Sequence, residues 1–328
     1  MANLKPVHAA AIARLRTYVP PPTQYYSLPL TRRAAVLILL YADRQGELRV
    51  VLTMRARTLR TYGGQAALPG GKADSLSETP FQTARREAQE EIGLPLLDSK
   101  FPPPFRIEHL CQMPTNLART ELGVRPCVAY LSPHPNFPAD RPYPTAEEAL
   151  IPRLDAKEVA AVFSAPFHSF LKEHLGHESV AAEGYGVETV GQRPEWYSGT
   201  WTDWHESRWR MHNFFVPLKG QTVAWAPTTK TSPAVGSSSL PYRDVPAAEG
   251  ASKKAQDEMK TFRVFGMTAR ILVDAARVAY GEEPEFEHNS HFGDEDMIGR
   301  LFRLGKLGGI RREGDELTRE DLIAASKI

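Results

Sequence analysis

The sequence predicts an α+β fold or an α/β/α layer pattern, and three observations indicate it. Segments with strand character outnumber segments with helix character along the 328 residues. The two kinds do not alternate regularly, as they do in parallel βαβ folds. One central helix follows directly on a glycine-rich loop. We therefore expect packed layers of sheet and helix with one central glycine-loop–helix motif, rather than a regular parallel βαβ fold.

The first elements follow in order from the N-terminus. Residues Pro6 to Tyr18 can form a helix that ends before a run of three prolines. Two strand-like runs come next, Ala34 to Ala42 and Glu47 to Met54, and the turn-prone residues between them predict a hairpin. The first run is too short to cross a bilayer, which takes about 20 apolar residues, so we interpret it as a buried strand.

The remaining elements are arranged around the glycine loop at Gly63 to Lys72. This loop leads to a helix from about Pro80 to Ile92, with Pro at its start and Gly93 at its end, where both residue types are favoured. A last amphipathic helix is expected from about Gly266 to Tyr280. The further strands are Ile107 to Met113, Val124 to Leu131, Val159 to Phe163 and Phe214 to Leu218.

We expect three parts along the chain. An N-terminal extension with a helix covers residues 1–30, a central domain covers 31–281, and a charged, peripheral C-terminal tail covers 282–328. Polar insertions interrupt the domain at about 176–200 and 226–257. The second contains too little apolar surface to offset the entropy of ordering it, so we expect a mobile surface segment.

Composition excludes several classes of protein. Hydrophobic residues make up 42%, and 40 Lys and Arg against 39 Asp and Glu leave a net charge of +1. This balance argues against a nucleic-acid binder or a polybasic membrane binder, and no apolar run is long enough for a membrane span. The two cysteines, Cys111 and Cys127, fit a reducing compartment and exclude a disulfide scaffold.

Three glutamates gather on one face of the helix predicted at 80–92. At about 100° per residue, Glu87, Glu90 and Glu91 lie together, away from the apolar face. Carboxylates at this spacing destabilise a helix by about 0.2–0.5 kcal/mol per pair unless a cation intervenes. Oxygen ligands without His or Cys nearby favour Mg²⁺ or Mn²⁺ over zinc. The alternative is a solvated, glutamate-rich helix face.

The loop before this helix favours a metal-bound pyrophosphate. In Pro69-Gly70-Gly71-Lys72, two glycines allow the backbone to approach a phosphate group closely. Arg86 stands four residues before Glu90 and can hold that side chain by a charge-assisted hydrogen bond. The loop is not a P-loop, because Ala73 stands where the magnesium-binding Ser or Thr would be.

The segment from Gly71 to Leu94, GKADSLSETPFQTARREAQEEIGL, resembles the Nudix box, G-x5-E-x7-R-E-U-x-E-E-x-G-U with U aliphatic. From Glu78 to Leu94 every fixed position matches, with Ala88 as the small apolar residue at U. Six residues instead of five separate Gly71 from Glu78, a departure that affects the loop rather than the helix.

The resemblance implies an α+β fold of the Nudix type, an α/β/α sandwich with a mixed sheet and a glycine-loop–helix catalytic motif. It also implies hydrolysis of a diphosphate by metal-assisted attack of water. It implies a set of catalytic residues and a set of metal ligands. The catalytic residues are Glu78, Arg86, Glu87, Glu90 and Glu91, and the metal ligands are Gly71, Glu87, Glu90 and Glu91. The general base stays open among these glutamates and the downstream residues Glu121, Asp155 and Glu158.

A second resemblance lies upstream and narrows the substrate. Leu52-Thr53-Met54-Arg55, Arg60, Gly64 and Leu68-Pro69-Gly70-Gly71 look like the L-L-T-x-R…R-x3-G-x3-F-P-G-G signature of the coenzyme A diphosphatase branch. Leu68 replaces the usual Phe. The implied substrate-binding residues are Arg55, Arg60, Gly64, Gly70, Gly71 and Lys72. Arg57 is a weaker candidate for a phosphate contact, because it can equally be a residue that simply flanks a strand.

The implied reaction converts coenzyme A, or an acyl or oxidised form of it, into 3′,5′-ADP and (acyl-)4′-phosphopantetheine. Phe163 and Phe167 are candidates for a pantetheine or acyl site, although core packing is the commoner role of such residues. The alternatives are a Nudix pyrophosphatase for NADH, ADP-ribose or an oxidised nucleoside triphosphate, and a non-catalytic Nudix sensor of nucleotides.

Two segments bear on localisation. The sequence stops at Ser326-Lys327-Ile328, a variant of the S-K-L tripeptide that a peroxisomal import receptor binds. The first 42 residues lack acidic residues and contain four arginines, as mitochondrial transit peptides do. We expect the peroxisome, with the import receptor as a partner, and keep the mitochondrion and the cytoplasm as alternatives.

Overall fold

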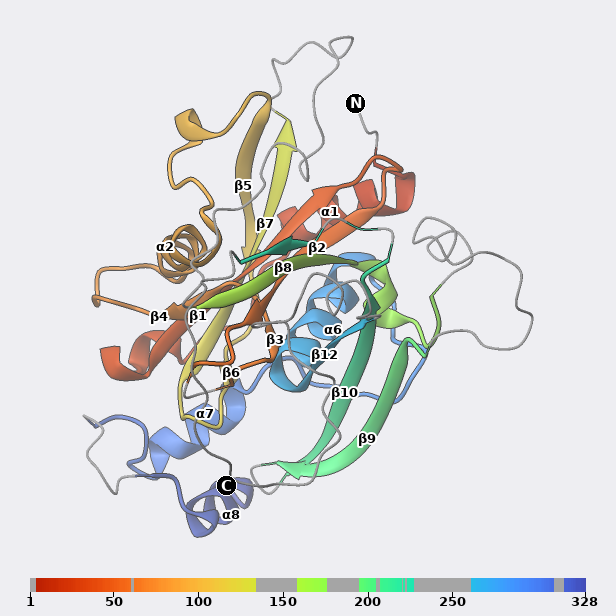
Figure 1. Cartoon of the computed structure of the whole chain (residues 1–328). Helices are drawn as coiled ribbons and strands as arrows, with labels where there is room; N and C mark the ends of the chain where they lie inside the picture. Colours follow the sequence, from red (N-terminus) through yellow and green to blue (C-terminus); the bar gives the residue numbers. More distant parts are fainter. Residues whose placement is uncertain are drawn as a thin grey trace, which may run out of the picture.

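A mixed sheet with helices on both sides lies at the centre of the computed structural model (Figure 1). The described residues are 4–59, 62–133, 158–175, 195–204, 207–219, 221, 223–226, 261–309 and 316–328. Within them the sheet follows the order β11-β8-β2-β1-β7-β5, and the short strands β3, β4 and β6 pair with β2, β1 and β7. The strands are β1 (Arg33–Ala42), β2 (Leu48–Arg55), β3 (Ala66–Ala67), β4 (Gly70–Lys72), β5 (Phe105–Gln112), β6 (Asn116–Leu117), β7 (Gly123–Pro133), β8 (Val159–Pro166) and β11 (Ala224–Trp225).

Strand β1 separates the two hydrophobic cores of the domain. It pairs antiparallel with β2 through the predicted hairpin and parallel with β7, which makes the sheet mixed. Leu37 and Leu39 pack in the core that contains helix α2 (Pro80–Ile92). Ile38 and Leu40 pack in the opposite core, which contains helices α1 (Pro6–Thr17) and α6 (Gly266–Tyr280). Burial on both faces explains why this strand is a continuous apolar run.

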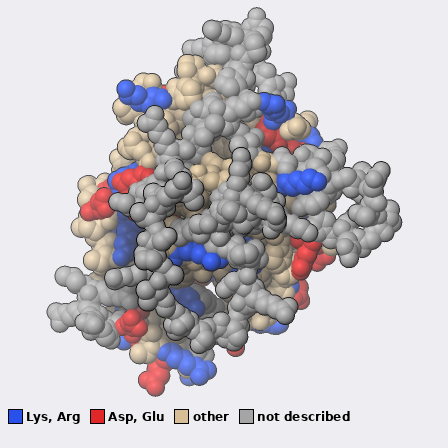
Figure 2. Space-filling model, in the orientation of Figure 1, with Lys and Arg blue, Asp and Glu red and all other residues tan. Residues whose placement is uncertain are grey.

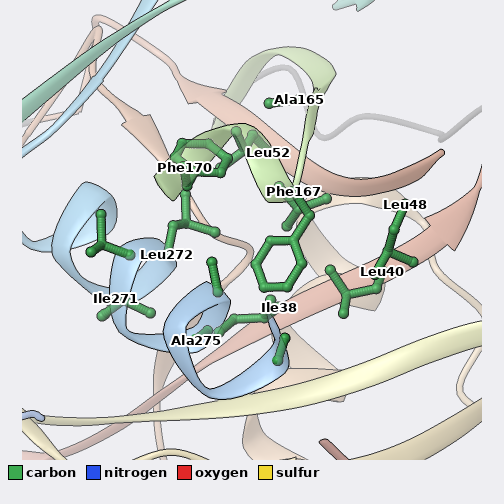
Figure 3. Packing of buried hydrophobic residues seen from close by; sticks show 14 of the residues in the cluster. Ile38, Leu40, Leu48, Leu52, Ala165, Phe167, Phe170, Ile271, Leu272 and Ala275 are labelled. Carbon is green, nitrogen blue, oxygen red and sulfur yellow. The ribbon is translucent and has the colours of Figure 1, made fainter. Parts of the chain in front are cut away.

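The larger core lies between the sheet and α6. Phe167 and Phe170 insert between Ile271, Leu272 and Ala275 on one side and strand residues such as Leu40 on the other (Figure 3). Phe163 is 2% exposed and Phe167 is fully buried. Both are therefore core residues, and the structure does not place them in an open site.

A second, three-stranded sheet packs against α6 and was only partly predicted. It has the order β12-β10-β9, with bounds Thr261–Phe265, Ser207–Pro217 and Tyr197–Trp204. Strand β9 begins within the segment 176–200, where we expected a polar insertion, so the structure corrects that expectation from Tyr197 onward. Its Ser, Gly and Asp residues give the segment a polar appearance, although its Tyr, Trp and Thr residues favour a strand, and it pairs along β10. Residues 176–194 and 227–260 lie outside the described residues.

The C-terminal residues are anchored rather than peripheral, which corrects the expected tail. Helix α7 (Glu295–Arg303) packs with helix α8 (Arg319–Ser326) on a small apolar cluster around Leu28 and Leu117. The Glu295 carboxylate accepts hydrogen bonds from the Gln24 and Thr115 backbone N–H groups and from Arg125. Asp294 accepts from the Leu117 N–H group and from Arg270. The charges predicted to be solvated thus bind polar groups of the domain.

The surface carries charges of both signs. Acidic and basic side chains are interspersed on the face shown in Figure 2, as the balanced composition leads one to expect.

None of the helices in the described part of the chain combines the length and hydropathy that crossing a bilayer requires.

Acid should destabilise the second sheet through His212. This β10 residue is 2% exposed and its Nδ1 lies 3.1 Å from the Tyr197 hydroxyl oxygen. Burial lowers its pKa to about 3, so the unfolded chain binds a proton below pH 6.5 that the folded chain does not. The free energy of unfolding should then fall by up to about 1.4 kcal/mol per pH unit between pH 6.5 and 4.

Urea unfolding at several pH values, compared between the wild type and His212→Gln, measures this contribution. The variant should lose that part of the slope while keeping the remaining pH dependence. Identical slopes in the two proteins would contradict the assignment to His212.

Candidate active site

Helix α2 begins and ends where the sequence predicts. Thr79 accepts a hydrogen bond from the Gln82 N–H group, and the Gln82 side chain accepts one from the Thr79 N–H group, which forms a capping box. Pro80 occupies the first turn, and Gly93 ends the helix in the left-handed conformation. The capping fixes the direction in which the acidic face of α2 points.

The two loop glycines lie directly against that acidic face. Strand β4 pairs with the start of β1, where a Cβ atom on Gly70 would overlap the Ala35 carbonyl oxygen. A Cβ on Gly71 would lie 2.5 Å from the Glu87 carboxyl group. At Gly70 the backbone leaves no room for a side chain, and at Gly71 a side chain would displace the Glu87 carboxyl group, so the loop backbone and the helix carboxylates share one small space.

Arg86 connects three of the predicted acidic residues. Its Nε donates to Glu78 (2.9 Å), and its Nη1 donates to Glu87 (3.1 Å) and Glu90 (3.2 Å). Its Nη2 donates to the Lys72 carbonyl oxygen (2.7 Å), which ties the helix to the loop. Burial opposes ionisation of Glu78, yet hydrogen bonds from Arg86 and the Asp74 N–H group lower its pKa. The Glu78 carboxylate therefore orders the loop through Arg86.

Glu91 is the most deeply buried acidic residue of the helix. Its side chain is 4% exposed, it accepts from the Gly70 N–H group (3.1 Å), and its Oε1 lies 3.8 Å from Arg55 Nη1. Burial raises the pKa of Glu91 to about 8, against the opposing effects of Gly70 and Arg55. Burial also raises the pKa of Glu87, with Arg86 opposing. A bound cation would offset the free-energy cost of ionising these two buried carboxylates.

Glu158 joins these carboxylates from another element. It stands just before β8, and its carbonyl oxygen accepts from the Ala56 N–H group (2.8 Å), next to Arg55. Its charge contributes to the raised pKa of both Glu87 and Glu91. No local sequence signal marks this approach, because it depends on the pairing of β2 with β8.

The other candidates for the general base stand elsewhere. Glu121 is buried in an ion pair with Arg32 and accepts a hydrogen bond from the Leu317 N–H group. These two contacts attach Glu121 to Arg32 and to the C-terminal segment. Asp155 lies outside the described residues.

The predicted substrate residues are only partly brought together. Arg55 reaches Glu91, and Gly64 donates its N–H to the Arg55 carbonyl oxygen (3.0 Å). Lys72 contributes its carbonyl oxygen to Arg86, while its own side chain is exposed. Arg60 lies outside the described residues.

The donor set suits a hard divalent cation, although the carboxylates are not arranged around one. Among the described residues, no three acidic, His or Cys side chains form a ready metal site. Arg86 holds Glu87 and Glu90, and the Gly70 N–H group holds Glu91. Buried carboxylate oxygens beside a glycine backbone are nevertheless the ligand chemistry that Mg²⁺ and Mn²⁺ prefer.

Comparison with known proteins gives the family. A model of the NUDIX domain matches residues 31–111. Over 302 residues the chain is 30% identical to peroxisomal coenzyme A diphosphatase 1 of Saccharomyces cerevisiae, covering 90% of this chain and 82% of the yeast protein. It is 41% identical over 145 residues to the chloroplastic Nudix hydrolase 22 of Arabidopsis thaliana, covering 43% of this chain and 40% of that relative.

Among solved structures, the NUDIX domain of Shewanella oneidensis NrtR complexed with ADP ribose is 21% identical, with a TM-score of 0.27. That match covers 42% of this chain and 75% of the other. The family assignment rests on the NUDIX match and on the yeast relative, which extends far beyond the box. The chain is thus a Nudix hydrolase, on the branch of the family to which the yeast coenzyme A diphosphatase belongs.

Proposed function

We propose that the enzyme hydrolyses the pyrophosphate bond of coenzyme A and of its acyl or oxidised derivatives, with Mg²⁺ or Mn²⁺ as the metal. The observation that carries this proposal is the 3.8 Å approach of Arg55 Nη1 to Glu91 Oε1. It joins the upstream signature to the Nudix helix in one site. The 30% identity to the yeast coenzyme A diphosphatase across 90% of this chain supports the same substrate class.

Glu87, Glu90, Glu91 and the Gly71 carbonyl oxygen are the residues that would hold the metal. When bound, a divalent metal screens the diphosphate charge and makes water a stronger acid. Arg86 keeps two of these carboxylates at the loop backbone, and the planar fork of Arg55 suits bidentate contact with phosphate oxygens.

Glu158 is the proposed general base. Its carboxylate takes a proton from the attacking water as the oxygen of that water bonds to one phosphorus atom. The bridging oxygen leaves with the other phosphate group, which gives two phosphomonoesters. Among the downstream candidates in the described part of the chain, Glu158 is the one whose charge acts on Glu87 and Glu91.

One test of this proposal concerns the substrate. Purified protein with Mg²⁺ should release 3′,5′-ADP from coenzyme A and acetyl-coenzyme A, but should not cleave NADH, ADP-ribose or an oxidised dGTP. Glu91→Gln should lower turnover by about 100-fold or more, because it removes a metal-facing carboxylate. Glu285→Gln, an exposed substitution remote from α2 in sequence, is the matched control and should keep full turnover.

Product chromatography distinguishes the outcomes. Cleavage of one of the other substrates would retain the metal helix and reject the proposed role of Arg55 and Arg60. No cleavage of any substrate would favour the sensor function.

Another prediction tests the base. Glu158→Gln should lower kcat by about 10²–10⁴-fold and leave KM nearly unchanged, because a lost base slows proton transfer without removing a substrate contact. Glu173→Gln, which also removes an exposed carboxylate near β8, is the control. Steady-state kinetics on coenzyme A measures both values, and a kcat equal to that of the control would refute the role of Glu158.

We further propose that the enzyme is peroxisomal, which rests on the location named for the yeast relative. Fluorescence imaging should show the tagged protein in peroxisomes and show its loss from them when Ser326-Lys327-Ile328 is deleted. Unchanged import after the deletion would exclude an import receptor that binds this tripeptide.

A further inference from the structure

Arg55 is fixed firmly through its backbone. Its N–H group donates to the Gln65 carbonyl oxygen, and its own carbonyl oxygen accepts from Gly64, both at 3.0 Å. The pairing of β2 with β8 shifts register between Met54 and Arg55. Such an irregularity redirects a side chain, and here it aims the Arg55 guanidinium at the acidic face of α2.

The Arg55 side chain itself is held loosely. Its Nη1 is 3.8 Å from Glu91 Oε1, beyond hydrogen-bond distance, and its buried Nε has no hydrogen-bond partner among the described residues. Arg86, by contrast, donates to three carboxylates and a carbonyl oxygen. Of these two arginines, Arg55 is therefore the one that can separate from its carboxylate partner at the lower free-energy cost.

The position of Arg55 conflicts with a divalent cation. Glu91 is 4% exposed at its side chain, so the guanidinium compensates a carboxylate that water barely reaches. A divalent ion on the same carboxylate would compensate it instead and would repel the guanidinium, and burial strengthens that repulsion. The two cations therefore compete for Glu91, and an anion that approaches the displaced Arg55 relieves the competition.

We propose that Arg55 is an exchangeable counter-ion, paired with Glu91 before the metal binds and released by the metal to bind the substrate diphosphate. This inference rests on the proposed function. It makes metal and diphosphate binding cooperative, and the coupling is reciprocal: each ligand strengthens the binding of the other. It also gives an order, since the phosphate-binding arginine becomes available only after the metal is in place.

The test measures the reactivity of Arg55 rather than turnover. The full chain is treated with phenylglyoxal, which modifies accessible guanidinium groups, and the rate at Arg55 is followed by peptide mass spectrometry. Adding Mg²⁺ should raise that rate roughly threefold or more, the change that loss of an ion pair of ordinary strength would give. Imidodiphosphate, an uncleaved diphosphate analogue, should lower the rate again, but only when Mg²⁺ is present.

Two variants control the measurement. In Glu91→Gln, Arg55 should react fast without Mg²⁺ and should not respond to it. Glu108→Gln removes the partner of Arg16, whose Nε lies 2.7 Å from Glu108 Oε1, and should raise the Arg16 rate with or without Mg²⁺. This second variant establishes that the reagent detects the loss of an ion pair.

The outcomes separate the inference from the proposed function. Binding of Mg²⁺ by calorimetry with an unchanged or lower Arg55 rate would overturn the exchange and leave the metal site intact. Protection of Arg55 by imidodiphosphate without Mg²⁺ would also overturn it. Absence of any Mg²⁺ binding would reject the proposed metal site together with the exchange.

Discussion

The candidate active site depends on keeping several carboxylates together at one face of α2. Like charges at this spacing repel one another, and burial increases the cost of each ionised group. Three features of the chain oppose that cost: the hydrogen bonds of Arg86, the Gly70 N–H group at Glu91, and the nearby charge of Arg55. The arrangement is stable as it stands, but it leaves Glu87 and Glu91 with a raised pKa and hence with a high affinity for positive charge.

Strand β1 explains why these groups meet in one place. Its first residues pair with the glycine loop, and its alternate side chains pack in the core beneath α2. Farther along the same edge β1 pairs with β2, which ends at Arg55, and β8 follows on the far side of β2 with Glu158 at its start. Segments that are distant in sequence thus deliver their charges to the same region of the domain.

The predictable parts of the fold are those with local signals. The bounds of α2, the β1–β2 hairpin and α6 follow from capping residues, turn residues and periodicity. Strand β9 was missed because Ser198, Gly199 and Asp203 give the segment a polar appearance, although its pairing with β10 is local in sequence. The nearness of Glu158 to Glu91 depends instead on the long-range pairing of β2 with β8. The anchoring of Glu295 was missed for a related reason, since a charged residue in a polar segment gives no indication of its partners.

That anchoring changes what counts as the smallest folding unit of this enzyme. A chain cut at residue 281, the boundary expected from the sequence, would leave the buried guanidinium groups of Arg125 and Arg270 without Glu295 and Asp294. Breaking a buried ion pair costs on the order of 3–5 kcal/mol, and a whole domain has only about 5–15 kcal/mol of stability. The Nudix box therefore acts as the centre of a larger cooperative unit, in which the two ends of the described chain are joined through the domain.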